Sequence, residues 1–137
     1  MFSEEIIQDL ISRAIAARQR AYVPYSGFPV GAALLTKSGQ IYTGCNIENA
    51  SYGMTVCAER VAILKAVSEG ETEFVLLAVA TEIGASPCGA CRQVMVEFAP
   101  DMPVLIADLA GQTTTLSAAQ LLPLAFLPQH LQEAARL

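Results

Sequence analysis

The residues Phe74-Val75-Leu76-Leu77-Ala78-Val79-Ala80 form an unbroken apolar run. A run of this length without polar alternation is typical of a strand that is covered on both faces. The segments on either side, residues 57–69 and 89–98, have the apolar spacing of helices, and Gly70 is placed to terminate the first of them. A buried strand between two helices predicts a sheet with helices on both faces.

The remaining elements follow from the same kind of pattern. An amphipathic helix is expected over 4–21, with Val23-Pro24 ending it. Further strands are expected at 30–36, 40–46, 103–107 and 113–116, a short helix from Ser117 to before Pro123, and a final helix from Pro128. The order α-β-β-α-β-α-β-β predicts one domain over residues 1–137, a three-layer α/β/α fold with a mixed five-stranded sheet.

Composition excludes several classes of protein. The 137 residues are 53% hydrophobic and 15% charged, which is incompatible with a disordered chain. Eight Lys and Arg against 13 Asp and Glu give a net charge of -5, with no basic run for a phosphate backbone, so no nucleic-acid partner is expected. A surface this apolar favours a homo-oligomer.

Membrane association and export are not expected either. The apolar run 74–80 is far shorter than the roughly 20 residues that span a bilayer. The N-terminal residues 1–5 carry acid where a signal peptide carries base. We therefore predict a cytoplasmic protein with reduced thiols, whose four cysteines are candidates for metal binding or catalysis.

Three of the cysteines lie at the expected starts of two helices. Cys57 opens the helix 57–69, and Cys88 and Cys91 open the helix 89–98. A helix N-terminus lowers the pKa of a cysteine, and zinc binds thiolates. Two helices that start from adjacent strand ends would aim three thiolates at one point. Three protein ligands leave a fourth position for water, as in catalytic zinc sites.

Two charged residues follow Cys57 directly. Glu59 is close enough to such a metal to exchange protons with bound water without being a ligand. Three thiolates on one Zn²⁺ leave an excess of negative charge. Arg60, one helical turn after Cys57, would offset this charge by donating to the cysteine sulfurs.

The pattern Cys57-x-Glu59, followed by Pro87-Cys88-x-x-Cys91, resembles the zinc-dependent cytidine deaminase superfamily. Many relatives use histidine as the first ligand, but the only histidine here, His130, lies far from the motif. The three cysteines and the short chain resemble the small homotetrameric enzymes that salvage free nucleosides, and the likeness runs from about residue 21 to 126. It implies one Zn²⁺ per chain, held by Cys57, Cys88 and Cys91.

The resemblance also implies a reaction. Hydroxide on the zinc attacks C4 of the cytosine ring, and Glu59 passes protons to ring N3 and to the amino group. Ammonia leaves, and cytidine or deoxycytidine becomes uridine or deoxyuridine.

Other segments resemble the substrate-binding parts of the same family. Within 22–33, Phe28 would line the pyrimidine pocket. Within 44–49, Asn46 and Glu48 would bind the sugar hydroxyl. Within 121–126, Phe126 would enter the site of a neighbouring subunit. Tyr52 and Ala58 match further pocket positions.

Other interpretations of these residues stay open. Cys88-x-x-Cys91 by itself also fits a redox pair or a structural zinc site. A closed four-cysteine site would recruit Cys45, but Cys45 faces away if Asn46 faces the pocket. The alternatives to a cytidine deaminase are a non-catalytic zinc-stabilised interaction module and a deaminase of another aminopyrimidine, such as the blasticidin S type. Asn46-x-Glu48 and the Phe126 motif favour cytidine.

Overall fold

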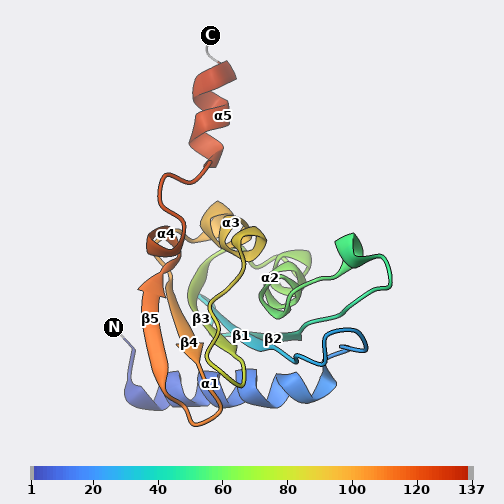
Figure 1. The fold of residues 1–137 in the computed structure, drawn as a ribbon. Coiled ribbons are helices and arrows are strands. Elements are labelled where there is room, and N and C mark those ends of the chain that lie inside the picture. Colours follow the sequence, from blue (N-terminus) through green and yellow to red (C-terminus); the bar gives the residue numbers. More distant parts are fainter. Residues whose placement is uncertain (1, 136–137) are drawn as a thin grey trace.

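The computed structural model describes residues 2–135 (Figure 1). The α-helices are α1 (Glu4–Ala17), α2 (Ala58–Ser68), α3 (Gly89–Phe98), α4 (Ala118–Leu121) and α5 (Pro128–Ala135), with short 3-10 helices η1 (Arg18–Arg20) and η2 (Tyr52–Met54). The strands are β1 (Gly31–Thr36), β2 (Ile41–Cys45), β3 (Phe74–Ala80), β4 (Pro103–Ala107) and β5 (Thr113–Ser117). Within residues 2–135, no helix combines the length and apolar character that crossing a membrane requires.

The strands form one mixed sheet in the order β2-β1-β3-β4-β5. β3 and β4 are parallel and are joined through α3, whereas every other neighbouring pair is antiparallel. Helix α1 covers one face of the sheet, and α2 and α3 cover the other (Figure 1). The predicted three-layer α/β/α fold with five strands is confirmed.

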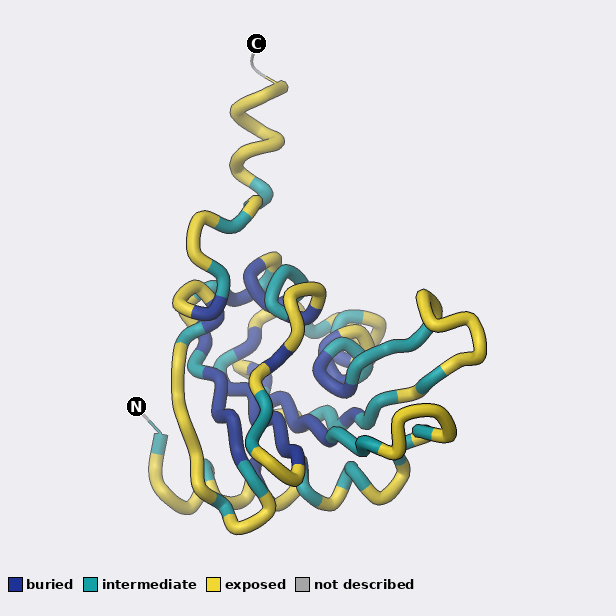
Figure 2. The backbone as a smooth tube through the Cα atoms, viewed as in Figure 1, coloured by how far each residue is buried: buried dark blue, intermediate teal, exposed yellow. Residues whose placement is uncertain are grey.

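The central strand β3 is buried on both faces. Leu77 and Val79 pack in the cluster beneath α2 and α3, while Leu76 and Ala78 pack in the cluster against α1. Figure 2 shows this strand as part of the continuous buried interior of the sheet. The apolar run therefore has the environment that its composition predicts.

Two glycines allow helices to lie directly on the sheet. A Cβ added at Gly31 would collide with the backbone of α1 at Ala14, and one added at Gly44 would collide with the backbone of α2 at Ala58. The absence of a side chain at Gly44 therefore fixes the first turn of α2 against β2. This is the turn that begins at Cys57.

The ends of the chain differ in how they are packed. The helix expected over 4–21 ends at Ala17 and continues as the 3-10 turn η1, where the Arg18 side chain donates from Nε to the Pro29 carbonyl at 3.2 Å. At the other end, Ser117 caps α4 as predicted, in a capping box with Gln120. Helix α5 projects away from the sheet and buries none of its residues (Figures 1 and 2).

Candidate active site

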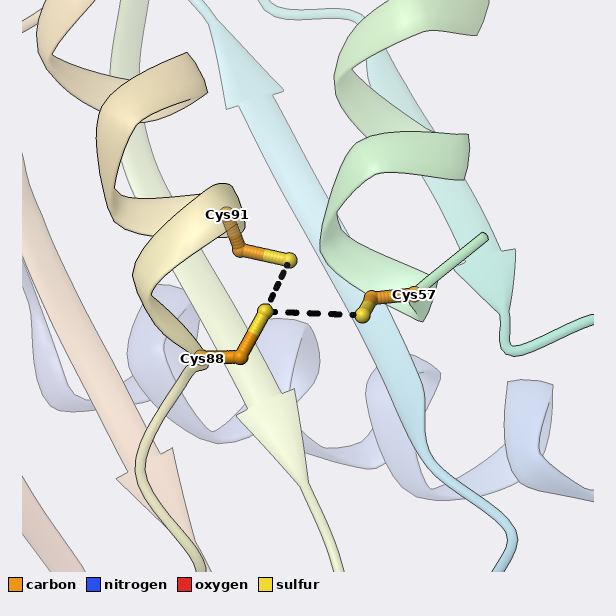
Figure 3. Close-up of side chains that lie close together, drawn as sticks. All are labelled: Cys57, Cys88 and Cys91. Atoms are coloured by element: carbon orange, nitrogen blue, oxygen red, sulfur yellow. Dashed lines mark hydrogen bonds between the residues drawn. The ribbon is translucent and has the colours of Figure 1, made fainter. Parts of the chain in front are cut away.

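The three predicted zinc ligands converge from the starts of α2 and α3 (Figure 3). Cys57 and Cys88 are the N-cap residues of these helices, and neither side chain caps its own helix. The Sγ atoms of Cys57 and Cys88 are 3.6 Å apart, and those of Cys88 and Cys91 are 3.5 Å apart. All three sulfurs lie within 4.8 Å of one another.

This spacing fits a single zinc ion. Tetrahedral coordination with Zn–S bonds of about 2.3 Å separates neighbouring sulfurs by about 3.8 Å, close to the distances found. Among residues 2–135 the cluster contains no fourth Cys, His, Asp or Glu, and Cys45 at the end of β2 lies outside it. The donor set is therefore three thiols with one coordination position left for another molecule, as in a catalytic site.

The surroundings of the cluster favour thiolate at Cys57. The pKa of Cys57 is lowered to about 5, because the Cys91 thiol and the Arg60 guanidinium stabilise its negative charge. Arg60 Nη2 lies 3.4 Å from Cys57 Sγ. The pKa of Cys91 is raised, because its thiol is hydrogen-bonded to Cys57 and is buried. Metal binding to such a set releases the remaining protons.

Glu59 lies in the first turn of α2, next to the cluster. Its residue is only 3% exposed, and burial raises the pKa of its carboxyl to about 7. A carboxyl with this pKa exchanges protons readily near neutral pH. Glu59 is therefore suited to acid–base chemistry rather than to an ion pair.

A cavity of about 180 Å³ joins the cluster to the predicted pyrimidine pocket. It is lined by residues of four segments: Phe28, Val30, Asn46, Thr55, Cys57, Glu59, Val79, Thr81, Ala85, Ser86 and Cys88. A larger groove of about 480 Å³ between α1, β2 and α2 contains neither the cluster nor Glu59. The smaller cavity is the candidate active site, because it alone of the two brings acid and thiols together.

The predicted sugar-binding residues hold the loop that carries Phe28. Asn46 Oδ1 accepts from the Val30 N–H at 2.9 Å, and its Nδ2 donates to the Phe28 carbonyl at 2.9 Å, which leaves one N–H for a ligand. Glu48 lies outside the cavity lining. It accepts from the backbone N–H groups of Tyr25 and Ser26 and from the Ser26 hydroxyl, and these hydrogen bonds lower its pKa.

The other three predicted substrate residues do not line this cavity. Ala58 is fully buried at the start of α2. Tyr52 is 75% exposed and contacts Tyr25 edge to face, with ring centroids 5.9 Å apart. Phe126 is exposed beyond α4 and stacks on His130.

Part of the cavity wall, formed by Thr81, Ala85 and Ser86, was not predicted from the sequence. These residues lie in the loop that leaves the carboxyl end of β3 and leads to Cys88. Ligands of α/β sheets bind outside the carboxyl ends of strands, so the position of this loop was a usable signal. Its small polar residues carry no motif of their own.

Comparisons with known proteins identify the family of the chain. The family model for the cytidine and deoxycytidylate deaminase zinc-binding region matches residues 4–107. A cytidine deaminase from Sporosarcina psychrophila is 54% identical over 132 residues, covering 94% of this chain and 97% of its own. A blasticidin-S deaminase from Bacillus cereus is 38% identical over 107 residues, covering 71% and 76% of the two chains.

The structural comparison gives the same assignment. The crystal structure of a cytidine deaminase from Burkholderia pseudomallei superposes with a TM-score of 0.85 at 46% identity, covering 91% of this chain and all of the other. Its similarity extends well beyond the motif that holds the cysteines. The chain belongs to the family defined by the cytidine and deoxycytidylate deaminase zinc-binding region.

Proposed function

We propose that the protein is a hydrolase that converts free cytidine and deoxycytidine, with water, to uridine and deoxyuridine and ammonia. The observation that carries the proposal is the buried carboxyl of Glu59 beside three convergent cysteine sulfurs, with Glu59, Cys57 and Cys88 lining one small cavity. Cys57, Cys88 and Cys91 would hold one Zn²⁺ per chain. When bound, zinc makes water a nucleophile at neutral pH.

Glu59 is the proton carrier of the proposed reaction. Its carboxylate accepts one proton from the attacking water and delivers it to ring N3. It then takes the second proton from the oxygen that has added to C4 and delivers it to the amino group, which leaves as ammonia. In the chain without metal, burial raises the pKa of this carboxyl to about 7, which suits a group that both accepts and donates a proton near neutral pH. Because burial raises the pKa of Glu59, the residues that cover its carboxyl contribute to its proposed role in proton transfer.

The cavity favours a neutral ligand. Among its eleven lining residues there is no Lys or Arg, whereas recognition of phosphate would use such groups. Phe28 would pack on the pyrimidine ring, and the free N–H of Asn46 would donate to the sugar. Glu48 and Tyr52 would bind the sugar, and Ala58 would contribute its backbone at the start of α2.

The proposed active form is a homotetramer. Phe126 lies outside the cavity of its own chain and is 59% exposed, and Leu124 before it is fully exposed. An aromatic side chain without cover on its own chain is suited to packing on another copy. We propose that Phe126 enters the site of a neighbouring subunit. We also propose that the enzyme is a single domain over residues 1–137 and works in the cytoplasm.

A substrate panel tests the proposal. Purified protein is assayed for ammonia release from cytidine, deoxycytidine, cytidine 5′-monophosphate and blasticidin S. We expect the two nucleosides to be comparable and the nucleotide to be much poorer, because the cavity offers no cation. A preference for blasticidin S would favour the second deaminase type, to which a 38% identical relative belongs. Release from none of them would contradict the proposal.

A further inference from the structure

We propose that Arg92 is a positioning residue that fixes the Ser86–Pro87 part of the cavity wall and ties it to the end of α4. The proposal rests on the function proposed above, because the wall matters through the substrate it contacts. Arg92 follows the ligand Cys91 in the first turn of α3 and is absent from the lining of the cavity.

The guanidinium of Arg92 has three acceptors on two separate segments. Nε donates to the Pro87 carbonyl at 2.7 Å, Nη2 donates to Ser86 Oγ at 3.0 Å, and Nη1 donates to the Leu121 carbonyl at 2.7 Å. All three acceptors are neutral, and within residues 2–135 no salt bridge involves Arg92. The rigid fork of donors, rather than the charge, therefore defines its contribution.

The contacts to Ser86 and Pro87 hold one end of the loop between β3 and α3. At the other end of this loop, the Ala85 N–H donates to Thr81 Oγ1 at 2.7 Å. Ala85 and Ser86 line the cavity, and Cys88 follows directly. Arg92 thus sets the position of this part of the cavity wall relative to the cysteine cluster, although its side chain forms no hydrogen bond with the three cysteines.

The contact to Leu121 extends this coupling to the C-terminal segment. Leu121 is the last residue of α4, where helix carbonyls lack internal partners. Gln93, the residue after Arg92 in α3, donates from Nε2 to the Phe126 carbonyl at 2.8 Å. Two consecutive residues of α3 therefore fix the segment 121–126 and the cavity wall relative to each other.

The test compares Arg92→Lys and Arg92→Gln with the wild-type zinc protein. For each we would measure KM and kcat for cytidine, the Kd of uridine, zinc per chain and the unfolding temperature. A single ammonium cannot reach all three acceptors, so we expect the wall to shift and KM and the uridine Kd to rise by up to about 100-fold. We expect kcat to change less than KM and zinc to stay at one per chain.

The matched control is Arg13→Gln, which removes an exposed arginine whose hydrogen-bond partner is Asp9, and we expect it to leave all values unchanged. If Arg92→Gln does not fold, Arg92→Lys carries the test, because it keeps the charge and the aliphatic stem. Ser86→Ala should raise KM less in the Arg92→Lys background than in the wild type, because the hydrogen bond between residue 92 and Ser86 is already lost.

Two results would overturn the inference while leaving the proposed function intact. One is an active wild type in which both Arg92 variants keep KM and uridine Kd within twofold. The other is zinc loss in parallel with activity, which would place the effect on the metal ligands. A wild type that neither binds uridine nor turns over cytidine would instead overturn the proposed function, and this inference with it.

Discussion

At the scale of single residues, Arg60 places a cation against the thiolate cluster. Its Nη2 lies 3.4 Å from Cys57 Sγ, while its buried Nε has no hydrogen-bond partner among residues 2–135. A buried donor without a partner is costly, so the position of this side chain serves the sulfurs rather than the fold. Three thiolates would otherwise leave their excess negative charge uncompensated.

Arg60→Gln removes this compensation. We expect kcat for cytidine to fall and zinc retention against a chelator to weaken, each by about 10- to 100-fold, as for other groups that support metal ligands. Steady-state kinetics and zinc analysis after timed chelation measure both. Arg60→Lys is the control, because it keeps the charge and should retain more activity. Equal losses in the two variants would show that charge is not what Arg60 contributes.

Single residues also differ in how far their place in the site could be predicted from the sequence. Cys57, Glu59, Cys88 and Cys91 were predictable, because metal ligation and proton transfer restrict the residue types and spacing that can serve. The residue types of Thr81, Ala85 and Ser86 gave no such signal, because a cavity wall needs shape and backbone direction, which many small residues supply. Only the position of their loop after β3 indicated a role. Glu48 was expected to face the sugar, and in the single chain its carboxylate is occupied by the backbone of Tyr25 and Ser26.

At the scale of elements, the position of α2 on the sheet governs the site. Gly44 lies under the backbone of Ala58 and Ala62, so β2 and the first turn of α2 are in direct contact. Any side chain at this position would push away the turn that begins at Cys57 and includes Glu59. The packing of one element on another therefore sets the position of the carboxyl that we propose as catalytic.

Gly44→Ala tests this dependence. We expect the free energy of unfolding to fall by about 1–3 kcal/mol, because an extra methyl group is forced into a packed contact. We also expect kcat/KM for cytidine to fall in the fraction that remains folded. Chemical denaturation and kinetics at a temperature well below unfolding separate the two effects. Gly53→Ala is the matched control for stability, since a Cβ there meets no atom within 4 Å.

Most element positions were predictable from local patterns. Strand 74–80 and helix 89–98 agree with β3 and α3 in both bounds, because apolar runs and helix starts are local signals. The end of α1 was wrong by four residues. The predicted stop signal was Val23-Pro24, whereas the contact of Arg18 with the Pro29 carbonyl belongs to the tertiary structure and leaves no local pattern.

At the scale of the whole molecule, several large apolar side chains near the C-terminal end of the described residues lack cover from their own chain. Leu124, Phe126 and Leu131 are exposed, and Leu124 adopts a left-handed backbone with φ of 54°. A leucine in this conformation is strained, and such strain persists where surrounding contacts enforce it. We attribute those contacts to neighbouring subunits in the proposed tetramer.

The mass in solution tests the assembly. We expect sedimentation equilibrium to give four times the 14.5 kDa chain mass. Phe126→Ala should raise KM for cytidine, because each site would lose an aromatic contact from its neighbour. Leu109→Ala is a control of similar kind, since Leu109 is also an exposed apolar residue but lies outside the C-terminal segment. A fully active 14.5 kDa monomer would contradict the proposed role of Phe126.

The most direct measurement of the central claim compares the wild type with Glu59→Gln in one assay of uridine and ammonia formed from cytidine, with zinc per chain determined on the same samples. We predict equimolar uridine and ammonia from the wild type and one zinc per chain in both proteins. We also predict that kcat of the variant is lower by about 100- to 10,000-fold, the range that acid–base catalysis contributes. A folded, zinc-loaded Glu59→Gln protein with near wild-type turnover would contradict the account.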